Sequence, residues 1–134
     1  MYCMKKYENF CKAFVNLKSC LEISQPYSIA EQTGITGLFA ICFEQSWKLM
    51  KEILEYHGYF TQKTGSPRLI IKSAYQCGMI DNESCWLDIL EARNTLAHIY
   101  DEELALAVIK KILSEYIPAF EELKKSIDEN WLNS

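Results

Sequence analysis

The feature that most constrains the fold of this chain is the spacing of its apolar residues, which is helical wherever it can be scored. From Asp101 onward, apolar residues recur at steps of three and four positions, with charged residues between them. The apolar members of this series are Ala105, Val108, Ile109, Ile112, Leu113, Tyr116, Phe120, Leu123 and Ile127. We therefore expect one long helix here, with Asp101 as its N-cap and a bend at Pro118.

Two further helices are predicted in the first half of the chain. Apolar residues from Phe10 to Leu21 form a narrow stripe that ends before the break at Pro26. From about Gly37 to Tyr56, apolar residues occupy two faces instead of one. Because each apolar face needs a partner, we expect this second helix to pack against two neighbours.

Capping residues indicate a third and a fourth helix. Ser66 followed by Pro67 is typical of a helix start, and this short helix should run to about Cys77. Asp81 or Asn82 then caps the next helix. No segment alternates as a strand would, and no internal repeat is visible. We predict an all-α, up-and-down bundle of about five helices that forms a single domain over residues 1–134.

Composition agrees with one globular domain and makes some classes of protein improbable. A chain of 134 residues can bury roughly two thirds of the surface that it exposes when unfolded. No run without a charged, polar or glycine residue is longer than that from Leu38 to Phe43, which is far short of the ~20 apolar residues of a membrane span. No secretory signal is visible near the N-terminus, so we expect a cytoplasmic protein without membrane contact.

The charge balance and the metal-ligand residues narrow the function further. Fourteen basic and eighteen acidic side chains give a net charge of −4, so a polyanion would have to be bound locally rather than by the whole surface. The six cysteines form no C-x-x-C pair, and we interpret them as small, buried apolar residues in a reducing compartment. With His57 and His98 as the two histidines, we expect no metal and no cofactor.

Polar residues gather near the end of the expected fourth helix. Arg93, Asn94, His98 and Tyr100 lie close together among residues suited to burial, which is unfavourable unless they are paired. A structural interpretation is available: Arg93 would bind a neighbouring carboxylate, His98 a carbonyl at the helix end, and Tyr100 would pack its ring while Asp101 caps the next helix. From the residues alone, a structural role and a functional role both remain open.

Three blocks of the sequence resemble those of one known family in their order and spacing. They are residues 43–51 (FEQSWKLMK), 66–68 (SPR) and 86–101 (WLDILEARNTLAHIYD). The chain resembles the nucleotidyltransferase substrate-binding branch of the HEPN superfamily, which includes the HepT-like partners of minimal nucleotidyltransferases. The resemblance covers nearly the whole chain and implies a small helical bundle that forms a homodimer. It departs from the family at residues 37–40, where relatives often carry a charged residue after the aromatic one.

The resemblance also implies catalytic residues. In HEPN ribonucleases the R-x(4–6)-H motif is catalytic, and the matching positions here are Arg93 and His98, with Asn94 in support. Metal-independent RNA cleavage needs a base, an acid and a cation for the developing negative charge, and a two-fold dimer would supply two imidazoles to one cleft. On an ideal helix, residues five apart differ by about 140°, so the helix should end or distort near His98, or the pair should act across the dimer.

A chain with a negative net charge binds RNA poorly unless basic residues gather around the binding site. An RNA enzyme of this net charge would therefore need such a local basic rim. The candidates for substrate binding are Lys48, Lys51, Arg68 and Lys72, provided that the second, third and fourth helices meet at the cleft. The alternative is that these side chains form an ordinary solvated face, with Lys48 supporting its helix by pairing with Glu44.

The resemblance also implies that Tyr100 is a site of regulation by modification. In the toxin–antitoxin branch, the tyrosine of H-x-Y receives AMP from the partner nucleotidyltransferase, and His98 and Tyr100 keep that spacing. Two hypotheses follow. The chain is a ribonuclease toxin, with RNA as substrate and a cognate minimal nucleotidyltransferase as antitoxin, or it is a non-catalytic subunit that presents a substrate to that enzyme.

Overall fold

The computed structural model describes residues 4–62, 64–98 and 101–132, and all regular secondary structure within these ranges is helical. The elements are α1 (Met4–Lys18), a 3-10 turn (Ser19–Glu22), α2 (Ile29–Tyr56), α3 (Pro67–Gln76), α4 (Glu83–His98), α5 (Glu102–Lys111), a π-helical turn (Ile112–Tyr116) and α6 (Ile117–Asn130). Because α5, the π-helical turn and α6 follow one another without a break, they form the one long helix that was predicted. The described residues therefore contain the five expected helical segments.

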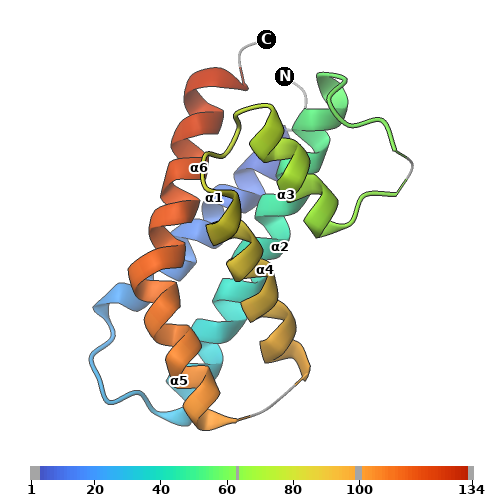
Figure 1. The fold of residues 1–134 in the computed structure, drawn as a ribbon. Helices are drawn as coiled ribbons and strands as arrows, with labels where there is room; N and C mark the ends of the chain where they lie inside the picture. Colours follow the sequence, from blue (N-terminus) through green and yellow to red (C-terminus); the bar gives the residue numbers. More distant parts are fainter. Residues whose placement is uncertain (1–3, 63, 99–100, 133–134) are drawn as a thin grey trace.

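The long helices run alternately down and up the molecule (Figure 1). Helix α1 descends, α2 ascends, α4 descends and the α5–α6 helix ascends, while the short α3 lies across the upper end. Helix α2 contacts α1, α3, α4 and α5, which agrees with its two predicted apolar faces. The predicted all-α, up-and-down bundle is confirmed.

Helix α2 begins well before Gly37, so its predicted start was wrong. The Ser28 side chain accepts a hydrogen bond from the backbone N–H of Glu31 (3.1 Å), and the Glu31 carboxylate accepts one from the Ser28 N–H (2.8 Å). This capping box fixes the start of the helix. Burial of Ile35 and Phe39, both fully inaccessible, adds stability that outweighs the weak helix propensity of glycine.

The other predicted helix ends agree with the structure. Ser66 accepts from the N–H of Leu69 (3.3 Å), and Asp101 accepts from that of Leu104 (3.2 Å). Asn82 caps α4 by accepting from the N–H of Cys85 (3.0 Å), which decides between the two predicted caps.

The long C-terminal helix is irregular just before Pro118. Its backbone is π-helical from Ile112 to Tyr116 and returns to the α-helical form at Ile117. Proline has no N–H to donate to the preceding turn, so a wider turn before it lets the chain continue without a break.

Aromatic rings join the long helices into one core. The ring of Phe120 on α6 lies 6.2 Å from that of Phe14 on α1, 6.4 Å from Phe39 on α2 and 5.3 Å from Trp86 on α4. Phe120, Phe14 and Phe39 are almost completely buried. Because the contact between Phe120 and Trp86 holds α4 against α6, it also fixes the helix that carries Arg93.

The described cysteines fall into two groups. Cys20 and Cys42 are buried, as predicted, whereas Cys11, Cys77 and Cys85 are only half-buried, which the prediction of buried cysteines did not anticipate; Cys3 lies outside the described residues. Of the helices described, none combines the length and the hydropathy that crossing a bilayer requires.

Candidate functional site

Arg93 is held in place by contacts with two neighbouring helices. From α4, its Nη2 donates to Glu44 Oε2 on α2 (2.9 Å), and its Nη1 donates to Asn94 Oδ1 (3.1 Å). Its guanidinium also lies 5.5 Å from the centre of the Phe43 ring, within the range of a cation–π contact. The Arg93 side chain is 27% exposed, so it is both anchored and accessible.

Glu44 is the carboxylate that anchors Arg93. Trp47 Nε1 donates to Glu44 Oε2 (3.1 Å), and Lys48 Nζ lies 3.3 Å from Glu44 Oε1. Burial raises the pKa of the Glu44 carboxyl, but hydrogen bonds from Trp47 and Lys48, together with the charges of Lys48 and Arg93, outweigh it and bring this pKa below its ordinary value. Glu44 is therefore ionised at neutral pH and binds the guanidinium as a charged pair.

An open cleft of about 420 Å³ lies where α2, α3 and α4 meet. Both arginines of the chain, Arg68 and Arg93, line it. The other lining residues are Trp47, Ser66, Pro67, Leu90 and Asn94. The three sequence blocks that carry the resemblance therefore meet at one place, as the hypothesis of a basic rim requires.

The structure brings one of the four predicted rim residues to this cleft. Arg68 lines it, whereas Lys48, Lys51 and Lys72 are absent from its lining. These three lysines pair with carboxylates instead: Lys51 lies 3.7 Å from Glu55 and Lys72 lies 3.9 Å from Glu83. The alternative interpretation, a solvated face of ion pairs, describes the lysines better than a substrate rim does.

His98 is the last residue of α4, and it is exposed. The helix stays regular up to this residue, so His98 lies about 7.5 Å farther along the axis than Arg93 and is rotated from it by about 140°. His98 is absent from the lining of the arginine cleft. One chain therefore holds Arg93 and His98 on different faces, and Tyr100 lies outside the described residues.

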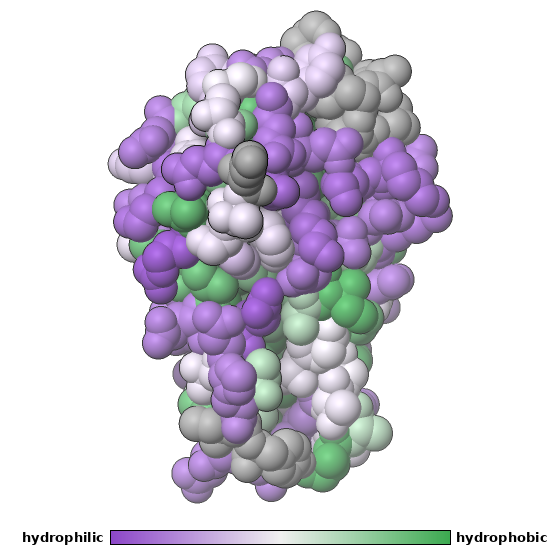
Figure 2. All heavy atoms as spheres, turned by 90° about the vertical axis from the view of Figure 1, so that its right-hand side faces the viewer, coloured by the Kyte–Doolittle hydropathy of each residue, from purple (hydrophilic) through white to green (hydrophobic). Residues whose placement is uncertain are grey.

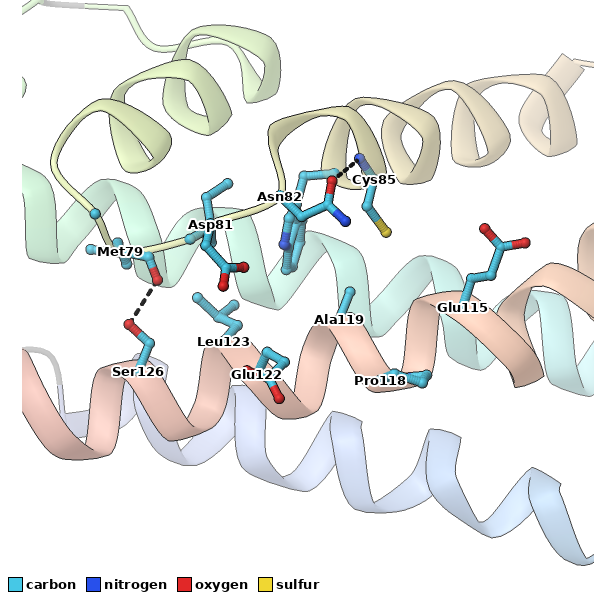
Figure 3. Close-up of a pocket in the computed structure, with 13 residues that line it drawn as sticks. Met79, Asp81, Asn82, Cys85, Glu115, Pro118, Ala119, Glu122, Leu123 and Ser126 are labelled. Atoms are coloured by element: carbon cyan, nitrogen blue, oxygen red, sulfur yellow. Dashed lines mark hydrogen bonds between the residues drawn. The ribbon is translucent and has the colours of Figure 1, made fainter.

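A second cavity, of about 270 Å³, has the opposite character. It lies between α6 and the segment that joins α3 to α4, and its walls carry Asp81, Glu115 and Glu122 (Figure 3). Ser126 closes one end by donating a hydrogen bond to the carbonyl of Met79 (2.7 Å). Among the described residues no group of three or more potential ligands is placed to hold a metal ion. The carboxylates make this cavity unsuitable for a phosphate.

Sequence reasoning missed the role of Glu44. It assigned this residue to a pair with Lys48 within α2, but the carboxylate also binds Arg93 from a position 49 residues earlier in the chain. The available signal was the position of Glu44 inside the first of the three blocks. That signal could not identify the partner, because the contact depends on how α2 packs against α4.

Comparison with known proteins identifies relatives over most of the chain. Residues 5–129 match the family described as "Nucleotidyltransferase substrate binding protein like". The "Probable ribonuclease HepT" of Haemophilus influenzae is 33% identical over 90 residues, which are 63% of this chain and 62% of that relative. This match thus spans less than two thirds of the length of the curated relative.

Two solved structures share the fold. HI0074 from Haemophilus influenzae, described as having the fold of a substrate binding domain of a nucleotidyltransferase, is 25% identical, with a TM-score of 0.77 over 92% of this chain and 99% of that chain. The tri-AMPylated HEPN toxin of Shewanella oneidensis, in complex with an MNT antitoxin, is 16% identical. Its TM-score is 0.76 over 93% of this chain and 95% of that chain, which shows a common fold.

Proposed function

This chain belongs to the nucleotidyltransferase substrate-binding family of HepT-like HEPN proteins, and from that premise we propose that it is the ribonuclease toxin of a toxin–antitoxin pair. The observation that carries the proposal is the anchored, partly exposed Arg93, which lines a cleft together with the only other arginine of the chain. A cation fixed beside an open cleft can stabilise the charge that develops on a phosphate during cleavage. The relative named as a probable ribonuclease supports the same activity.

The reaction requires no metal in this proposal. An imidazole of His98 takes the proton from a 2′-hydroxyl, whose oxygen attacks the adjacent phosphorus, and a second imidazole gives a proton to the leaving 5′-oxygen. Arg93 binds the phosphate oxygens during the transfer, and Asn94 orients Arg93 through the hydrogen bond between their side chains. Two imidazoles are required because one group cannot act as base and as acid in the same step.

The proposal requires a homodimer, because one chain holds Arg93 and His98 on different faces. A second chain related by a two-fold axis would bring its own His98 to the shared cleft. Figure 2 shows that hydrophilic residues dominate the upper part of the face that carries α3 and α4, while paler and hydrophobic residues are more frequent toward its lower end. Apolar residues exposed on α2 and α5, which could be covered by a second chain, include Ile29 (50%), Ile41 (53%) and Leu106 (39%).

Regulation by a partner is the other half of the proposal. The hydroxyl of Tyr100 attacks the α-phosphate of ATP on a minimal nucleotidyltransferase, pyrophosphate leaves, and adenylate remains on the tyrosine. The added negative charge competes with the substrate for Arg93 and silences the toxin. A tri-AMPylated HEPN toxin with this fold, in complex with its antitoxin, supports the proposal. We place the reaction in the cytoplasm, where RNA and ATP are both available.

Cleavage of single-stranded RNA by the purified protein in excess chelator tests the ribonuclease activity. We expect the wild type to cut RNA and His98→Ala to lose the activity by about 100- to 10,000-fold. Lys125→Ala, which removes a charge from the exposed face of α6, is the control and should cut as the wild type does. If the wild type and His98→Ala are equally inert on diverse RNAs, the ribonuclease proposal fails.

The modification has a separate test. After co-expression with the cognate transferase, the intact mass of the wild type should increase by adenylate, and that of Tyr100→Phe should not. An unchanged mass in both proteins would contradict this part of the proposal.

A second candidate function is a non-catalytic subunit that presents a substrate to a nucleotidyltransferase. The description of HI0074 as a substrate binding domain and the net charge of −4 agree with it, whereas the relative named as a probable ribonuclease and the HEPN toxin with this fold support the toxin. The same chelator experiment separates the two, because an accessory subunit would leave RNA intact.

A further inference from the structure

Arg68 is the basic residue of the cleft that the proposed chemistry does not use. It lies at the start of α3, it is exposed, and none of the ion pairs among the described residues includes it. The other three residues of the predicted basic rim, Lys48, Lys51 and Lys72, are all paired with glutamates. Arg68 therefore has an accessible guanidinium that faces no competing side-chain charge in its cleft.

Arg93, which lines the same cleft, has N–H donors that its contacts with Glu44 and Asn94 do not use. A guanidinium carries five N–H donors, and the contacts with Glu44 and Asn94 use two of them. The remaining donors can bind phosphate oxygens without breaking the anchor. No aspartate or glutamate is found among the described residues that line this cleft. The N-terminal end of α3, where Ser66 and Pro67 lie, adds the positive end of a helix dipole.

The other wall of the cleft suits a nucleobase. Trp47 is partly exposed there, and its Nε1 bond to Glu44 fixes the orientation of the indole. Leu90 and Pro67 add apolar surface beside it. Bases stack on aromatic side chains of this kind without strong sequence preference. A volume of about 420 Å³ is at the low end of the range of small-ligand sites, which suits one nucleotide rather than a duplex.

We propose that this cleft is a subsite for one nucleotide unit of single-stranded RNA, with the phosphate between Arg68 and Arg93 and the base on Trp47. The inference rests on the proposed function, gives the predicted residue Arg68 a phosphate contact and adds Trp47 as a base contact; neither residue takes part in proton transfer. A free nucleoside monophosphate has the same chemistry, so the test contains an arm for each source.

The test measures binding separately from cleavage. The probe is a fluorescein-labelled single-stranded oligoribonucleotide with 2′-O-methyl groups, which lacks the attacking hydroxyl, and its anisotropy gives the dissociation constant. Arg68→Ala should weaken binding about tenfold and reduce the dependence of log K on log salt concentration by about one. The affinity of Arg68→Lys should lie between those of Arg68→Ala and the wild type, because lysine keeps the charge but lacks the paired N–H donors of the guanidinium. Lys125→Ala, which also removes one positive charge, should bind within about twofold of the wild type.

Trp47 variants test the base contact. Trp47→Phe keeps an aromatic face and should bind within about threefold of the wild type, whereas Trp47→Leu should lose about tenfold. Circular dichroism melting curves of each variant confirm that it is folded. A Trp47→Leu protein that is folded and binds as well as Trp47→Phe overturns the stacking contact.

The results distinguish failure of the subsite from failure of the ribonuclease activity and from a different ligand. Equal binding by Arg68→Ala and Lys125→Ala overturns the subsite even if wild-type protein cleaves RNA, and the proposed function then stands without it. Arg68-dependent binding of the oligonucleotide by a protein that never cleaves RNA supports the subsite and overturns the ribonuclease. If unlabelled AMP binds through Arg68 and the oligonucleotide does not, the RNA source is overturned in favour of a free nucleotide.

Discussion

Two cavities of this molecule are built from neighbouring elements and carry opposite charge. The cleft between α2, α3 and α4 is lined by Arg68 and Arg93, whereas the cavity between α6 and the segment joining α3 to α4 is lined by Asp81, Glu115 and Glu122. Helix α4 contributes to both. A chain with a net charge of −4 can therefore offer a polyanion a local positive site, while Asp81, Glu115 and Glu122 line a different cavity.

Arg93→Lys should cause the largest change on the arginine side of this comparison. Lysine keeps the charge but cannot make the paired contacts of a guanidinium with a phosphate and with Glu44. We expect cleavage of RNA to fall about 100-fold, measured as initial rates in excess chelator. A rate within twofold of the wild type would show that only the charge at this position matters.

Glu44→Gln should have a smaller effect, because it removes the anchor of Arg93 and leaves the guanidinium in place. Glutamine can still accept from Trp47, but it no longer holds a charged partner. We expect the rate of cleavage to fall about tenfold, since a displaced catalytic group loses orientation. Glu44→Asp keeps the charge and should retain more activity than Glu44→Gln; the reverse order would argue against a charged anchor.

The same carboxylate predicts a small pH dependence of stability. Because the pKa of Glu44 is lower in the folded chain than its ordinary value, its ionised form stabilises the fold above that ordinary value, and this contribution is lost as the pH falls through the lowered pKa. Urea unfolding should find the wild type more stable than Glu44→Gln by at most about 1 kcal/mol at pH 7, because the pair is partly exposed. The difference should shrink in acid, and a difference that grows in acid would have the wrong sign.

The smallest effect is expected on the acidic side. Glu122→Gln changes the charge of the second cavity, which the proposed chemistry does not use. Its RNA cleavage should stay within about twofold of the wild type, as for an exposed residue far from the reacting groups. A large loss of RNA cleavage would indicate that the reaction takes place in the acidic cavity and not in the arginine cleft.

The fold was predictable because its signals are local. Apolar spacing and the caps at Ser66 and Asp101 predict the helices, and the structure confirms them. The start of α2 was missed because the expectation placed it at Gly37, whereas the Ser28–Glu31 capping box lies farther upstream. Burial of the residues that follow the cap stabilises the first turns of α2, and burial depends on how the whole bundle packs.

The candidate site was predictable only in part. The motif predicts Arg93 and His98, but the contact between Arg93 and Glu44 joins residues far apart in the chain, so it depends on tertiary packing. Of the predicted basic rim, Arg68 faces the cleft while the lysines turn to nearby glutamates. Side-chain direction on a helix decides this, and sequence spacing alone does not fix it.

The relation between two copies of His98 tests the central claim most directly. In a crystal structure of the dimer formed in solution, we predict that the two imidazoles and the Arg93 side chains face one shared cleft, close enough to contact a single phosphodiester. Two copies of His98 that lie far apart, or that point to separate surfaces, would contradict the claim that paired chains build one ribonuclease site.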